Sequence, residues 1–161
     1  MIKTAFAIIL FSLSIFAQSE IYFEKSNATF TIPDGCTVDY DNEGLYSVES
    51  ADGLVEITLQ EIEADATTIS NTTMDAIQDN FTDVHFEDQR TDNFNGIDVL
   101  LDAVQCKDGE TGEDVMIMVA VYDIADTVCI QFVATFNPEN NQAVMDLIRN
   151  VAGSISVFMG E

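Results

Sequence analysis

The stretch that decides the fold is NGIDVLLDAVQCKDGETGEDVMIMVAVYD, residues 95–123, because it places two long apolar segments between clear turn signals. Asn95-Gly96 is the strongest short hairpin signal in the chain, since both central residues of a type I′ turn need a positive φ. The loop KDGETGE then separates the first long segment from DVMIMVAVY, residues 114–122. Apolar residues occupy both faces of that second segment, which predicts a central strand covered on both sides.

Further strands are predicted on both sides of this pair. VHFEDQRTDNF, residues 84–94, meets it across the Asn95-Gly96 turn, and TVCIQFVATF follows the turn at residues 123–126. Towards the N-terminus, SEIYFEKSNATFTIPDG predicts one or two short strands before a turn at residues 33–35. TVDYD, LYSVES and LVEITLQ predict three more, and the last alternates apolar with polar residues as a half-buried strand does.

A helix is predicted in the middle of the chain, where DATTISNTTMDAIQDNF has apolar residues at helical spacing. The pattern favours a helix over residues 70–81. Thr67, Thr68 and Ser70 are the residues available as its N-cap.

A second helix is predicted near the C-terminus. Asn137 is expected to cap it, Pro138 suits its first position, and Gly153 is expected to end it. The order of elements predicts a single α+β domain over residues 18–161, with an antiparallel sheet of six or seven strands packed against two helices. A cystatin-like roll is the alternative fold.

This order of elements resembles the PsbP/Mog1-like superfamily, which includes many small exported bacterial domains. FTIPDGC, residues 30–36, is similar to a family stretch with an aromatic residue, a proline, a glycine and a tryptophan, although Cys36 stands here in place of the tryptophan. Residues 95–123 are similar to the family's central hairpin, and AVMDLIRNVAGSISV to its closing helix. The resemblance implies the same sandwich and a non-catalytic binding task, and no functional residue is carried over with it.

Residues 1–17 are expected to be a secretory signal peptide, since Lys3 precedes an apolar run that ends at Ala17. The run is shorter than the roughly 20 apolar residues that a membrane span needs. We therefore expect cleavage after Ala17 or Gln18, and a secreted or periplasmic protein without stable membrane insertion. An uncleaved N-terminal anchor is the alternative.

The mature chain is strongly acidic. Without residues 1–17, four basic side chains remain against 29 acidic ones, which is a net charge of −25. Such a charge repels nucleic acids and anionic lipid surfaces, so no nucleic-acid partner is expected. It suits either a salty, cation-rich medium or a surface that binds a protein of opposite charge.

The cysteines and the only histidine do not form a recognisable motif. The chain has an odd number of cysteines, Cys36, Cys106 and Cys129, and none of them is in a CxxC spacing, so no disulfide framework is predicted. Cys106 and Cys129 are expected to be unbonded, because one strand lies between theirs. The three cysteines and His85 would be an acceptable ligand set for zinc, but their spacing in the sequence favours scattered, half-buried thiols. A catalytic His85 is disfavoured too, since a histidine between apolar residues usually packs or caps; no catalytic residue and no cofactor is predicted.

DYDNEG, residues 39–44, begins like a calcium loop of the EF-hand type, with Asp39, Asp41 and Glu43 at alternate positions and Gly44 sixth. The twelfth position, which needs a bidentate glutamate, holds Ser50, and the flanks are predicted strands. A polar hairpin loop is therefore the favoured interpretation, with weak Ca²⁺ binding as the alternative. KDGETGED is a second acidic loop of the same kind.

Two functions from different classes follow from these observations. The favoured one is an exported, non-catalytic binding or accessory protein whose partner is a protein with a basic surface. Contact is expected through sheet-end loops or through an apolar cleft beside a helix. The alternative is a small hydrolase or metal-dependent enzyme.

Overall fold

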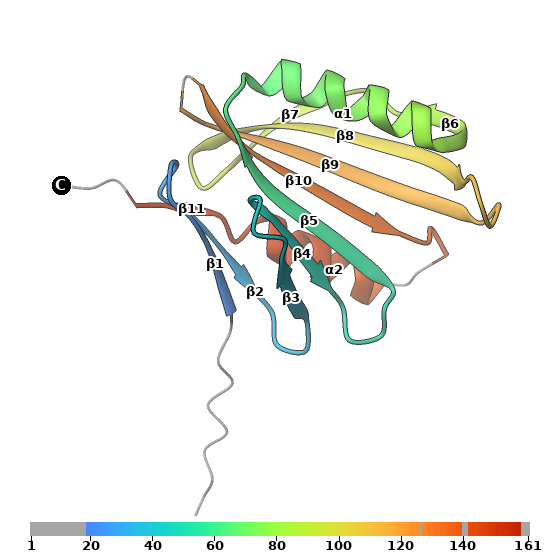
Figure 1. The fold of residues 1–161 in the computed structure, drawn as a ribbon, viewed down its shortest axis with the longest axis horizontal. Helices are drawn as coiled ribbons and strands as arrows, with labels where there is room; N and C mark the ends of the chain where they lie inside the picture. The colour runs from blue at the N-terminus through green and yellow to red at the C-terminus, as the bar shows by residue number, and fades with distance from the viewer. Residues whose placement is uncertain (1–18, 126, 140–141, 159–161) are drawn as a thin grey trace, which may run out of the picture.

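The computed structural model describes residues 19–125, 127–139 and 142–158, and these form two antiparallel sheets and two helices (Figure 1). The expected signal peptide at residues 1–17 and its cleavage site lie outside the described residues. Within the described ranges, no helix is long and apolar enough to cross a membrane.

The larger sheet has eight strands. In spatial order they are β3 (Thr37–Tyr40), β4 (Leu45–Glu49), β5 (Val55–Ile62), β10 (Val128–Phe136), β9 (Asp114–Ala125), β8 (Ile97–Asp108) and β6 (Phe81–Phe86), with β7 (Arg90–Phe94) also paired to β8. The prediction of six or seven strands is therefore slightly low. One reason is that residues 84–94, expected as one strand, belong to two: β6 and β7 both pair with β8, and Gln89 between them turns its side chain to Asp102.

The first two strands form a separate small sheet, which the sequence pattern does not predict. It contains β1 (Ser19–Phe23), β2 (Ala28–Ile32) and the two-residue β11 (Ser156–Val157). Phe23 and Phe30 point into the core that the small sheet shares with the larger one, and their rings meet edge to face at 6.2 Å. The strands β1 and β2 therefore pack against the face of the larger sheet and do not pair with its edge strand.

The larger sheet is the middle layer, with a helix on each side (Figure 1). On one face, α1 (Ala66–Asn80) covers a cluster that includes Ile117, Val119 and Val121 of β9. On the other face, α2 (Gln142–Ala152) and the small sheet cover a cluster that includes Ala120 and Tyr122. The predicted central strand buried on both faces is confirmed, and an arrangement with a helix on each face is not a cystatin-like roll.

The hairpin between β7 and β8 has the predicted geometry. Asn95 has a φ of 54° and Gly96 a φ of 87°, as both central residues of a type I′ turn require. The register pairs Phe94 with Ile97, so Asn95 and Gly96 alone connect the two strands.

The helix α1 begins earlier than predicted. Its N-cap is Asp65, whose Oδ1 accepts a hydrogen bond from the backbone N–H of Thr68 at 2.9 Å. The expected caps Thr67, Thr68 and Ser70 lie inside the helix, and Ser70 is fully buried. The Ser70 hydroxyl donates a hydrogen bond to Asp102 on β8 at 2.7 Å. This side chain, which was expected to cap the helix, therefore makes a tertiary contact instead.

The helix α2 begins later than predicted, at Gln142, so Pro138 is not its first residue. Oδ1 of Asn137 accepts from the N–H of Glu139 at 2.8 Å, which closes a turn between β10 and the helix. The predicted end is confirmed, because the helix stops at Ala152 immediately before Gly153. The hydroxyl of the fully buried Tyr122 donates to the carbonyl of Ala152 at 2.7 Å and holds that end against the larger sheet.

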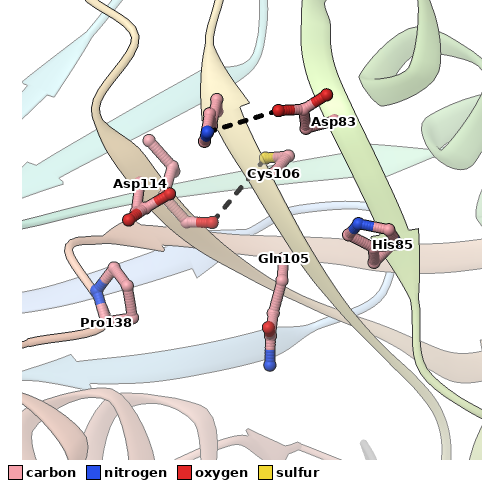
Figure 2. Close-up of a pocket in the computed structure, with 8 residues that line it drawn as sticks. Asp83, His85, Gln105, Cys106, Asp114 and Pro138 are labelled. Carbon is pink, nitrogen blue, oxygen red and sulfur yellow. Dashed lines mark hydrogen bonds and ion pairs between the residues drawn. The ribbon is translucent and has the colours of Figure 1, made fainter.

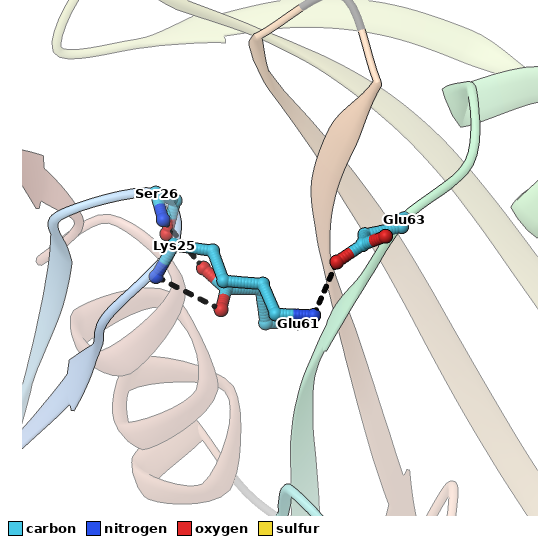
Figure 3. Close-up of polar contacts among 4 residues, drawn as sticks. All are labelled: Lys25, Ser26, Glu61 and Glu63. Carbon is cyan, nitrogen blue, oxygen red and sulfur yellow. Dashed lines mark hydrogen bonds and ion pairs between the residues drawn. The ribbon is translucent and has the colours of Figure 1, made fainter.

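The carboxylate of Glu61, near the end of β5, joins the two sheets (Figure 3). Its oxygens accept from the backbone N–H groups of Ser26, at 2.7 Å, and of Lys25, at 3.2 Å, in the turn between β1 and β2. The side chain of Lys25 in turn forms an ion pair with Glu63. One carboxylate thus holds the turn of the small sheet against the middle layer.

Candidate functional site

The loop DYDNEG connects β3 to β4 as a hairpin, in agreement with the favoured interpretation. The N–H groups of Leu45 and Glu43 donate to Oδ1 of Asp41, at 3.0 and 2.7 Å, and they lower the pKa of this carboxyl. Gly44 supplies a φ of 107°. Asp39 is a strand residue paired with Ser47, so it lies outside the loop itself. Of the two candidate calcium ligands within the loop, Asp41 and Glu43, Asp41 already serves the turn. In the described part of the chain, no three His, Cys, Asp or Glu side chains are grouped to hold a metal ion.

The second acidic loop, between β8 and β9, is built in the same way. The N–H groups of Thr111 and Glu110 donate to Oδ1 of Asp108, at 2.7 and 2.9 Å, and lower the pKa of that carboxyl. Because β3 and β8 run in opposite directions in the sheet, this loop and DYDNEG lie at opposite ends of it. The two predicted acidic loops therefore do not form one site.

A polar hollow of about 360 Å³ lies at the end of the sheet beside the second loop (Figure 2). His85, Gln105 and Cys106 line it, together with Asp83, Lys107, Asp114, Val115 and Pro138. Lys107 forms an ion pair with Asp83 at 3.3 Å. His85 is exposed, which corrects the expectation that it packs or caps.

His85 and Cys106 line the same hollow, but they do not form a nucleophile and base pair. His85 pairs directly with Gln105 across β6 and β8, so their side chains share one face of the sheet, while Cys106 points to the opposite face. The thiol of Cys106 is buried and donates to the carbonyl of Val115 at 3.7 Å. Burial raises the pKa of this thiol, which disfavours the reactive thiolate.

The candidate zinc ligands are not brought together. Cys36 packs against the core on the α2 face, whereas Cys106 and Cys129 are buried under α1. Strand β9 lies between the strands of Cys106 and Cys129, and all three cysteines are free, which confirms that these two are unbonded. Burial raises the pKa of Cys129 to about 11, as expected for an inert thiol.

The end of the sheet with the second loop carries a concentration of carboxylates. A second hollow of about 390 Å³ lies between the β4–β5 and β8–β9 loops, and Asp114 lines both hollows. Within the described part of the chain, Lys107 is the only cation that lines either of them. We call this region the acidic end and define it by Glu56, Asp83, Glu110, Glu113 and Asp114.

A third cavity, of about 300 Å³, lies between α2 and the larger sheet, and we call it the α2 cleft. Its lining is largely apolar and includes Phe94, Leu101, Met118, Phe132, Met145, Ile148 and Ala152. Arg90 at the start of β7 and Arg149 on α2 also line it. An apolar cleft beside a helix was expected, but the sequence did not identify these residues, because the two arginines come from elements far apart along the chain.

Three layers, with an antiparallel sheet between helices, define an α+β sandwich of the PsbP/Mog1-like type. No protein-family model and no curated protein sequence matches the chain. Among solved structures it is similar to a cyanobacterial PsbP (CyanoP) from Synechocystis, with a TM-score of 0.68 and 14% identity over 91% of this chain and 96% of that one.

Two other solved structures have the same architecture. LpqN of Mycobacterium tuberculosis, which is involved in cell envelope biogenesis, gives a TM-score of 0.60 and 9% identity over 87% of this chain and 90% of its own. A protein from Bacteroides thetaiotaomicron gives 0.61 and 8% identity over 90% of this chain, but over only 50% of its own. The resemblance predicted from the sequence is confirmed for the fold, and at these identities it establishes the fold alone.

Proposed function

We propose that this protein is an exported, non-catalytic accessory protein that binds a protein with a basic surface at its acidic end. The observation that carries the proposal is the loop between β8 and β9. Its exposed carboxylates are Glu110, Glu113 and Asp114, of which Asp114 lines both hollows and Glu113 lines one. Among the described residues, a single lysine lines the two hollows, and it is already paired with Asp83.

These carboxylates are available to a partner. Asp108 accepts hydrogen bonds from its own loop, but the side chains of Glu110, Glu113 and Asp114 accept none from the described residues. Their common charge would accelerate the encounter with a basic surface and make the affinity fall as salt rises. The two hollows would supply specificity by receiving side chains of the partner.

Export is supported by the apolar leader at residues 1–17, and an envelope setting by the likeness to LpqN. A non-catalytic role is supported by the polar hollow, where His85 and Cys106 project from opposite faces of the sheet. A small hydrolase remains the alternative, and the experiment below includes it.

The test is an affinity capture with the mature chain immobilised and exposed, at low salt, to proteins of its own cell envelope or culture fluid. A captured protein is then titrated against two variants that remove three charges each. The first is Glu110→Gln/Glu113→Gln/Asp114→Asn, at the acidic end. The matched control is Glu24→Gln/Asp39→Asn/Glu43→Gln, at the other end of the sheet.

We expect the first variant to bind about tenfold more weakly, since each exposed ion pair contributes on the order of 0.5 kcal/mol, and the control to bind as the wild type does. Equal losses in both variants would mean that overall charge, and not the acidic end, determines binding. If nothing is captured while the purified protein hydrolyses an ester, glycoside or peptide, and His85→Ala abolishes that turnover, the enzyme reading replaces the proposal.

A further inference from the structure

We infer that the α2 cleft binds a small amphipathic carboxylate, with its apolar chain in the cavity and its carboxylate at Arg90 and Arg149. This site is separate from the acidic end and does not depend on it. The argument uses the distribution of positive charge, the construction of the cavity and its size.

The positive charges of the chain are few, and the two arginines line one cavity. The sequence has 29 acidic residues against five basic ones, and Arg90 and Arg149 are its only arginines. Lys25 is paired with Glu63 and Lys107 with Asp83.

The two guanidinium groups form at most one weak ion pair with the described residues. Arg149 approaches Asp146, one helical turn away, at 3.7 Å, and both side chains are more than half exposed, so the pair contributes little. Arg90 forms no ion pair with any described residue. A planar guanidinium that can make two parallel hydrogen bonds matches a carboxylate better than a lysine does.

The lining of the cavity does not direct a carboxylate of its own toward these arginines. Among the described residues, Asp102 is the one acidic residue that lines it, but its carboxylate accepts from Ser70 of α1, at 2.7 Å, and from Gln89. Since α1 lies on the opposite face of the sheet, the side chain of Asp102 is directed away from the cleft. An incoming carboxylate would therefore meet two cations without a competing carboxylate in the lining.

The walls of the cleft are apolar and incompletely packed. Phe94, Leu101, Met118 and Met145 remain half-buried, whereas neighbours in the same cluster such as Phe132 are fully buried. Methionine is the apolar side chain that adapts most readily to a new occupant. At about 30 Å³ for each water-sized group, the cavity of about 300 Å³ holds roughly ten non-hydrogen atoms. That is the size of octanoate.

The test uses the intact mature protein and octanoate as the probe, with binding followed by calorimetry and by the NMR signals of the methionine methyl groups. Two further probes separate the contributions: 1-octanol keeps the chain without the charge, and acetate keeps the charge without the chain. Arg90→Gln and Arg149→Gln are exposed substitutions that leave the core intact. Lys25→Gln is the matched control, because it removes the same charge far from the cleft.

We expect octanoate to bind at least about tenfold more tightly than either other probe, and each arginine substitution to weaken it about tenfold, as loss of one hydrogen bond to a charged group predicts. The methyl signals of Met118 and Met145 should shift, and that of Met74, which belongs to α1 on the opposite face of the sheet, should not. The inference is overturned if octanoate produces no signal at millimolar concentration. It is also overturned if 1-octanol binds equally well, or if Lys25→Gln weakens binding as much as the arginine substitutions do.

Discussion

Replacing Glu61 by alanine should loosen the small sheet from the larger one. The carboxylate accepts two backbone hydrogen bonds from the β1–β2 turn, of which the one from Ser26 is partly buried and short, at 2.7 Å. The longer one from Lys25, at 3.2 Å, is exposed, and water can replace it. A hydrogen bond to a charged group contributes about 1.5–3 kcal/mol, so we expect Glu61→Ala to lower the free energy of unfolding by about 2 kcal/mol.

The assay is equilibrium unfolding in urea, where this loss corresponds to a midpoint lower by about 1 M for a slope of about 2 kcal/mol per M. Glu56→Ala is the control, because Glu56 is an exposed carboxylate on the same strand, and both changes remove one negative charge. Glu61→Gln should fall between them, since it retains one acceptor oxygen without the charge. Identical midpoints for Glu61→Ala and Glu56→Ala would refute the view that this carboxylate holds the small sheet in place.

Three further outcomes are expected. Tyr122→Phe, which removes only the hydroxyl bonded to Ala152, should lower the free energy of unfolding by about 1 kcal/mol in thermal melts; an unchanged melt would mean that the bond contributes nothing. Hydrogen bonds from Thr68 lower the pKa of Asp65, so the stability that its charge contributes is present above about pH 4 and is lost as the pH falls through the lower folded-state pKa. The stability difference between the wild type and Asp65→Asn should therefore shrink in acid, and a difference independent of pH would contradict this. Melting temperatures should rise in both sodium chloride and choline chloride, since the Debye length falls from about 30 Å at 0.01 M to 3 Å at 1 M; a flat response would show that the net charge of −24 is spaced too widely to matter.

Much of the fold follows from local signals in the sequence. The alternation in β5, the two-sided apolar pattern of β9 and the Asn95-Gly96 turn each predict the structure that is found, because each depends on residues close together in the chain. The errors occur where a distant contact decides. Ser70 could have capped α1, but it is bound to Asp102 on β8, and the cap is Asp65. The N-terminal strands were predicted correctly, but their place in a separate sheet depends on packing that no local pattern encodes.

The candidate sites show the same division. Both acidic loops were predicted as polar turns, and Gly44 has the expected positive φ. The hydrogen bonds that Asp41 and Asp108 accept from N–H groups a few residues away were not predicted. Predicting that the loops lie at opposite ends of the sheet would have required knowledge of the strand order. Predicting that Arg90 and Arg149 line the same cavity would have required, in addition, the position of α2 on the sheet. The composition could therefore indicate that cations are scarce, but not that two of them line one cavity.

The small sheet gives the chain an obligatory order of assembly. Its third strand, β11, pairs Ser156 with Thr29, and the hydroxyls of these two residues lie 2.9 Å apart. A polypeptide that emerges from its N-terminus first, whether from a ribosome or through a secretion channel, presents β2 long before β11 exists to pair with it. The edge of β2 that pairs with β11 thus stays uncovered until residues 156–157 have emerged. Closing so long a loop is also slow, so the pairing of β11 with β2 should be among the late steps of folding.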